Sequence, residues 1–136
     1  MEESFIPKKI VLIIDDEPDI HHIFHRLLSN DTTLEVQHAR DGYEGVEKYK
    51  LLTQSNKEPA LVLMDLNMPG ICGFECAKQI LQVFKSANIF AFTANYDRDM
   101  EKNIKNIGMR GVISKDNDFK HIHSLVQQNI NYTTNQ

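Results

Sequence analysis

The chain has 136 residues, with 15 basic and 19 acidic side chains, and its formal net charge is -4 with histidine neutral. Hydrophobic residues make up 41% and charged residues 25%, which is typical of a globular protein and excludes a disordered or collagen-like chain. The longest apolar runs, 10–14 and 60–64, are far shorter than the roughly 18 residues of a membrane span. The start of the chain lacks a secretory-signal pattern, and the mild acidity excludes a broad cationic surface for direct nucleic-acid binding. We therefore predict a single soluble domain in the cytoplasm, with no membrane partner.

Short apolar runs alternate with longer segments of helical spacing along the chain. The runs expected to form strands are 9–14, 34–39, 60–64, 88–92 and 111–114. Apolar residues recur at helical spacing after each run, as in Phe119, Ile122, Leu125, Val126 and Ile130 of the last segment. This alternation predicts an α/β fold, in which five helices cover both faces of a five-stranded parallel sheet. By analogy with the common flavodoxin-like, doubly wound topology, we expect the strand order 2-1-3-4-5.

The predicted domain covers residues 8–130, between an N-terminal extension (1–7) and a polar C-terminal tail (131–136). Polar side chains stand where its strands end: Asp15, Asp16, Glu17, Asp65, Thr93 and Lys115. Because the carboxyl ends of parallel strands meet at one edge of a sheet, we expect these side chains to converge. Clustered carboxylates repel one another unless a cation lies between them, and Mg²⁺ prefers such oxygen ligands together with phosphate. The pattern therefore predicts a carboxylate nucleophile that attacks phosphorus at a magnesium site.

Four motifs occur in chain order at these strand ends: IIDDEP (13–18), LVLMDLNMPG (61–70) followed by Gly73, FTA (92–94) and SK (114–115). With them, the sequence resembles the response-regulator receiver domains of two-component signalling, over about residues 8 to 130. The resemblance implies that Asp65 is the phospho-acceptor, which takes its phosphoryl group from a histidine kinase or a histidine phosphotransfer protein. It also implies that Asp16, Asp65 and the main-chain carbonyl of Asn67 bind Mg²⁺, and that Asp15 holds the ion mainly through water.

The same resemblance assigns the remaining polar residues of the edge. Lys115 would contact a phosphoryl oxygen, and Thr93 would move to hydrogen-bond the phosphoryl group and switch the conformation. Asn67 and Asn95 stand two residues beyond Asp65 and Thr93, where the family tunes the lifetime of the acyl phosphate. The face formed by the fourth helix, fifth strand and fifth helix would bind an unknown downstream protein. The chain would then be a stand-alone regulator or the receiver of a hybrid kinase or longer regulator.

Three positions depart from the family pattern. Val112 stands three residues before Lys115, where an aromatic switch residue is frequent. Asp116 replaces the proline that usually follows the lysine, and a non-proline cis bond costs about 2.5–4 kcal/mol, so we expect a trans bond there. Cys72 stands where an aspartate is common. These departures concern the output surface, whereas the residues of the phosphorylation chemistry are intact.

Two other functions stay open. A phosphorylation-independent pseudo-receiver is favoured by Val112 and Asp116 and disfavoured by the intact acidic pair. A haloacid dehalogenase-type phosphohydrolase would also use Asp65 as nucleophile, but that class carries an acid two residues later, where this chain has Asn67. We expect a signalling phospho-acceptor rather than an enzyme that turns over a separate substrate.

The histidines and cysteines are interpreted as structural or surface residues. His21, His22 and His25 are predicted on a solvated face of the first helix, because no glutamate or fourth ligand is placed beside them as a zinc site would need. His121 and His123 are predicted on the surface of the last helix. Cys72 and Cys76, four residues apart, are expected to be reduced thiols.

Overall fold

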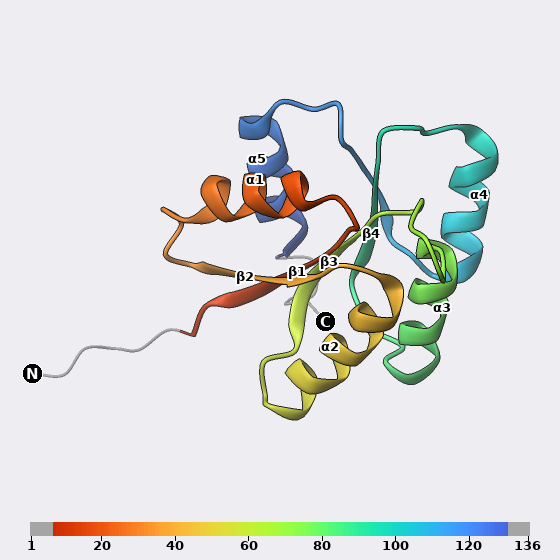
Figure 1. Cartoon of the computed structure of the whole chain (residues 1–136), viewed down its shortest axis with the longest axis horizontal. Coiled ribbons are helices and arrows are strands. Elements are labelled where there is room, and N and C mark those ends of the chain that lie inside the picture. The colour runs from red at the N-terminus through yellow and green to blue at the C-terminus, as the bar shows by residue number, and fades with distance from the viewer. Residues whose placement is uncertain (1–6, 131–136) are drawn as a thin grey trace, which may run out of the picture.

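The computed structural model of the protein describes residues 7–130, so the predicted extension, apart from Pro7, and the predicted tail lie outside the described residues. One sheet holds the strands β1 (Lys9–Ile14), β2 (Leu34–Ala39), β3 (Pro59–Met64), β4 (Ile89–Thr93) and β5 (Gly111–Ser114). All neighbouring strands are parallel, and their order is β2-β1-β3-β4-β5 (Figure 1). The flavodoxin-like prediction is confirmed, and the strand bounds differ from the predicted ones by one residue at β3 and β4.

Five helices cover the two faces of this sheet: α1 (Pro18–Leu28), α2 (Gly42–Gln54), α3 (Gly73–Val83), α4 (Arg98–Ile107) and α5 (Phe119–Ile130). Figure 1 shows α1 and α5 together on one face and α2, α3 and α4 on the other. The side chains of β1 alternate between the two cores: Val11 and Ile13 pack with α1 and α5, whereas Leu12 and Ile14 pack with α2 and α3. Apart from Lys9 at the start of β1 and Thr93 at the end of β4, the central strands are therefore apolar, because both of their faces are covered.

The last helix differs in one detail from the predicted apolar stripe. Ile122, Val126 and Ile130 are buried, as predicted, but Phe119 is 53% exposed. Phe119 is the first residue of α5 and so precedes the part of the helix that lies against the sheet. Within the described residues, no helix combines the length and the apolar character that crossing a membrane requires.

The carboxyl ends of β1 and β3 lie side by side because of the strand register. Ile14 pairs with Met64, so that Asp15 and Asp65 follow at the same level, and the Asp65 amide donates to the Ile14 carbonyl at 2.9 Å. The beginning of α3 packs directly beneath this edge. A Cβ atom on Gly73 would lie 2.2 Å from the Asp65 carbonyl oxygen, so only glycine allows this close approach.

Candidate functional site at the carboxyl edge of the sheet

Three aspartates gather at the carboxyl edge. One carboxylate oxygen from each of Asp15, Asp16 and Asp65 can be chosen so that all three lie within 4.8 Å of one another. Asp15 and Asp65 are buried, at 0% and 4% exposure, and Asp16 is more open to solvent. The predicted convergence of the residues after β1 and β3 is therefore confirmed.

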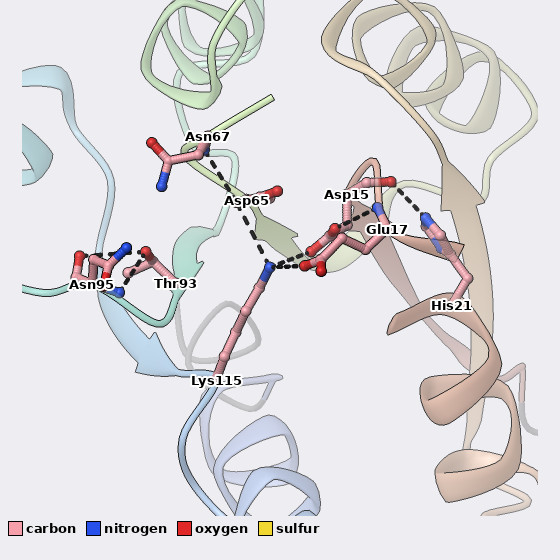
Figure 2. Close-up of polar contacts among 8 residues, drawn as sticks. All are labelled: Asp15, Glu17, His21, Asp65, Asn67, Thr93, Asn95 and Lys115. Carbon is pink, nitrogen blue, oxygen red and sulfur yellow. Dashed lines mark hydrogen bonds and ion pairs between the residues drawn. The ribbon is translucent and has the colours of Figure 1, made fainter. Parts of the chain in front are cut away.

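Lys115 reaches into this acidic group from the end of β5 (Figure 2). Its Nζ lies 3.0 Å from Asp15 Oδ2, 3.0 Å from Glu17 Oε1 and 3.7 Å from Asp65 Oδ1. Burial acts to lower the pKa of Lys115, but hydrogen bonds to Glu17 and Asp15 and the charges of Asp15 and Asp65 together raise this pKa above its usual value. The ammonium is thus held in its charged form, surrounded by three carboxylates.

The environment of Asp65 disfavours the ionised form of its carboxyl group. Burial, together with the charge of Asp15, raises the pKa of Asp65 to about 6. A hydrogen bond from the Asn67 amide to Asp65 Oδ1, at 3.1 Å, and the charge of Lys115 act in the opposite direction. A nearby cation would therefore stabilise the ionised form of the buried Asp65 carboxylate.

The donor set fits a small divalent cation. Asp15, Asp65 and Glu17 lie around the ammonium of Lys115, and Asp16 adds a further carboxylate beside Asp15 and Asp65. Asp15 Oδ2 is buried, and the ammonium of Lys115, 3.0 Å away, is its partner. The three clustered aspartate carboxylates, two of them buried, are the hard oxygen ligands that Mg²⁺ prefers.

Thr93 lies at the end of β4 on the other side of Asp65, with its side chain buried. Its Oγ1 accepts a hydrogen bond from the Asn95 amide at 3.2 Å and lies 3.4 Å from the Asn95 carbonyl, to which it donates. The hydroxyl is therefore engaged within its own loop (Figure 2). The residues predicted at the four strand ends thus lie at one edge of the sheet. The Thr93 hydroxyl is hydrogen-bonded to the main chain of Asn95 and not to Asp65.

Comparison with known proteins agrees with this geometry. Residues 11–127 match the family described as the response regulator receiver domain. The chain belongs to this receiver family. It is 29% identical over 112 residues to the chemotaxis protein CheY of Treponema pallidum, covering 82% of this chain and 76% of that protein. It is also 27% identical over 119 residues to the transcriptional regulatory protein DegU of Brevibacillus brevis, covering 87% of this chain but only 49% of DegU.

Among solved structures, a CheY-like receiver domain protein of Methanospirillum hungatei has the same fold. The two superpose with a TM-score of 0.83 over 95% of this chain and 98% of that one, at 19% sequence identity. The family match makes this chain a receiver domain of two-component systems. The chain spans about half the length of the DegU relative that it matches.

The structure shows the surroundings of the three positions that depart from the family pattern. Val112 is half-buried in β5, where it lines a groove of about 670 Å³ together with Tyr96 and Ile104. The described residues contain no cis peptide bond, so the Lys115–Asp116 bond is trans, as predicted. Cys72 and Cys76 are free thiols, as predicted, the first exposed and the second buried.

Three residues of this receiver differ from what the sequence predicted or were not singled out. Glu17 is a direct partner of Lys115, whereas its position after β1 predicts only that it lies at the edge of the sheet. The prediction of a solvated His21 is wrong, because His21 lies half-buried against His38 and the Asp15 carbonyl. The surface prediction for His123 is also wrong, because its Nε2 lies 2.9 Å from Asp31 Oδ2 between α5 and the loop after α1. None of these contacts follows from periodicity, because each joins separate elements.

Proposed function

We propose that this receiver accepts a phosphoryl group on Asp65 from the phosphohistidine of a histidine kinase or a histidine phosphotransfer protein. The observation that carries the proposal is the placement of Asp65, a buried carboxylate grouped with two further aspartates and 3.7 Å from the ammonium of Lys115. An Asp65 oxygen would attack phosphorus, forming an acyl phosphate, while the phosphorus–nitrogen bond of the donor breaks and its electron pair returns to the imidazole. The reduced thiols of Cys72 and Cys76 suit a cytoplasmic setting.

Asp15, Asp16, Asp65 and the main-chain carbonyl of Asn67 would hold Mg²⁺ in this proposal. The ion would supply positive charge that offsets the negative charge of the phosphoryl oxygens as the carboxylate approaches. The acidic grouping and the raised pKa of Asp65 support this assignment.

Lys115 and Thr93 would respond to the new phosphoryl group. Lys115 would exchange a carboxylate partner for a phosphoryl oxygen, and Thr93 would exchange its hydrogen bonds with Asn95 for one to the phosphoryl group. Because Thr93 ends β4 and α4 begins a few residues later, this exchange would shift the loop between them. Asn67 and Asn95 flank the phosphoryl position and would influence how readily water reaches it.

The shifted loop would alter the face formed by α4, β5 and α5, which we propose as the contact surface for a downstream protein. Val112 leaves the groove beside α4 without the aromatic residue that is frequent at this position. This single observation favours the second candidate function, a receiver whose partner binding does not depend on phosphorylation. The signalling role is otherwise that of a phospho-acceptor and not of an enzyme acting on a separate substrate.

Intact-protein mass spectrometry after incubation with acetyl phosphate or phosphoramidate tests the proposal. The wild-type protein should gain one phosphoryl group in Mg²⁺ and none in excess EDTA. Asp65→Asn should gain none, whereas Asp99→Asn, which changes an exposed carboxylate in α4, should behave like the wild type. Labelling of Asp65→Asn would overturn the choice of acceptor, and no labelling of the wild type would favour the phosphorylation-independent receiver.

A further inference from the structure

One histidine of α1 contacts the main chain of the acidic edge. His21 Nε2 lies 2.7 Å from the carbonyl oxygen of Asp15, and His21 Nδ1 lies 2.7 Å from Nδ1 of His38 in β2. The two rings meet edge to face, with centroids 4.8 Å apart. Figure 2 shows the His21 ring directed from α1 toward Asp15. The ring therefore bridges the first helix, the second strand and the end of the first strand.

The two contacts define the tautomers of both neutral rings. A carbonyl oxygen only accepts hydrogen bonds, so His21 Nε2 carries the proton and donates to Asp15. His21 Nδ1 then has a free lone pair and accepts from Nδ1–H of His38. Burial, followed by the positive potential of His21 and His25, lowers the pKa of His38 to about 4, in keeping with a neutral donor. His38 thus orients the ring that holds Asp15.

The Asp15 carbonyl belongs to the peptide group that leads into Asp16. Because a peptide group is planar, an anchored carbonyl also sets the direction in which the Asp16 backbone leaves the strand. Two other hydrogen bonds hold the same turn: the Asp15 amide donates to the Ala39 carbonyl at 3.1 Å, and the Glu17 amide donates to Asp15 Oδ1 at 2.9 Å. His21 supplies the contact on the carbonyl side, just beyond the end of β1, where the ladder of the sheet stops.

We propose that His21 is a positioning residue of the metal site, which holds the Asp15–Asp16 peptide group so that both carboxylates are aligned for Mg²⁺. The inference rests on the proposed function, since it concerns the same acidic group. His21 touches no metal ligand atom. It acts through the Asp15 carbonyl, as outer hydrogen-bond partners do in other metal sites.

Two amide substitutions separate the hydrogen bond from the packing of the ring. The Gln amide nitrogen reaches the position of Nε2, whereas the Asn amide nitrogen reaches only that of Nδ1. His21→Gln therefore keeps the donor to Asp15, and His21→Asn loses it. His22→Asn, at the exposed neighbour in the same helix, is the matched control. Mg²⁺ affinity is measured by isothermal titration calorimetry in a buffer of about pH 8, where free imidazole is neutral.

We expect Mg²⁺ to bind His21→Asn roughly 10-fold more weakly than the wild type, with His21→Gln and His22→Asn near the wild-type affinity. Nitrogen-15 NMR of the wild-type ring should show the Nε2–H tautomer of His21. Wild-type affinity in His21→Asn, or equal weakening in His21→Gln and His21→Asn, would overturn the inference. The opposite tautomer would also overturn it. A wild-type protein that binds no Mg²⁺ would instead overturn the metal site of the proposed function, and the positioning role with it.

Discussion

Glu17 Oε1 and Lys115 Nζ lie 3.0 Å apart, although 98 residues separate them in the sequence. The Glu17 side chain is 60% exposed, while that of Lys115 is only 13% exposed. Lys115 is at the same time 3.0 Å from the buried Asp15 carboxylate. The lysine is thus shared between one exposed and one buried acid, and the exposed one adds negative charge at the entrance of the site.

Glu17→Gln should accelerate phosphorylation by acetyl phosphate. The substitution removes a negative charge that repels the anionic donor and releases Lys115 from one partner. Exposed ion pairs contribute up to about 1 kcal/mol, so we expect an increase of about 2- to 5-fold in rate. The rate is measured by mass spectrometry at several time points, with Glu47→Gln in α2 as the control. A rate equal to or below that of the wild type would show that Glu17 does not compete for the lysine.

Asp65→Asn should stabilise the metal-free protein in a pH-dependent manner. Burial raises the pKa of Asp65 from 3.8 to about 6, so the folded protein binds this proton more tightly than the unfolded chain does. The resulting stability is present below about pH 4 and is lost as the pH rises to about 6. In EDTA, the free energy of unfolding of Asp65→Asn should therefore exceed that of the wild type by about 1–2 kcal/mol near pH 8. Near pH 4, the two free energies of unfolding should show no such difference.

Urea unfolding followed by far-ultraviolet circular dichroism measures this difference at both pH values. Addition of Mg²⁺ near pH 8 should raise the stability of the wild type and narrow its difference from Asp65→Asn, because the bound ion offsets the carboxylate charges. A difference that is equal at both pH values would contradict the raised pKa as its cause.

Asp31→Ala should destabilise the contact between the loop after α1 and helix α5. Asp31 Oδ2 accepts from His123 Nε2 at 2.9 Å and from Gln127 Nε2 at 3.0 Å, and Oδ1 accepts from the Thr33 amide at 2.9 Å. Hydrogen bonds from Thr33 and His123 lower the pKa of Asp31, so this stabilisation is present above about pH 4 and is lost as the pH falls further. We expect a loss of about 1 kcal/mol near pH 7.

The pH dependence of this loss is the decisive part of the test. The urea midpoints of the wild type and Asp31→Ala should converge as the pH is lowered from about 7 to about 3. Asp116→Ala, at an exposed position, should leave the midpoint near the wild-type value at both pH values. Midpoints that stay equally far apart at low pH would assign the effect to packing rather than to the Asp31 charge.

Gly73→Ala should disturb both the stability and the site. The new methyl group would meet the Asp65 carbonyl oxygen at 2.2 Å and Leu66 Cα at 2.8 Å, and both are backbone atoms. Relief of this overlap requires α3 to move away from the strand end, so we expect a loss of about 2–3 kcal/mol and weaker Mg²⁺ binding. Gly111→Ala is a milder comparison, because its methyl group would meet only the Phe90 ring at 3.0 Å. Equal effects of the two substitutions in urea unfolding would contradict this explanation.

Sequence patterns alone determine the fold class and place the acidic residues at strand ends, whereas the strand order 2-1-3-4-5 follows only by analogy with the flavodoxin-like topology. The run 10–14 is apolar at every position, as expected of a strand that is buried on both faces. Alternation with helices then leads to a parallel sheet, whose carboxyl ends share one edge. The backbones of Asp15 and Asp65 are therefore neighbours whatever rotamers their side chains adopt, because the register of β1 and β3 places these two residues at the same level.

The tertiary structure decided which side chains contact one another at that edge. The Thr93 hydroxyl is turned to Asn95, Lys115 is shared with Glu17, and His21 is half-buried although its helix position suggested solvent. Periodicity reports which face of its own helix or strand a residue occupies. It carries no information on the rotamer of that residue or on a neighbouring element that covers it. His21 is covered because β2 brings His38 beside α1, and this contact exists only once the sheet has formed.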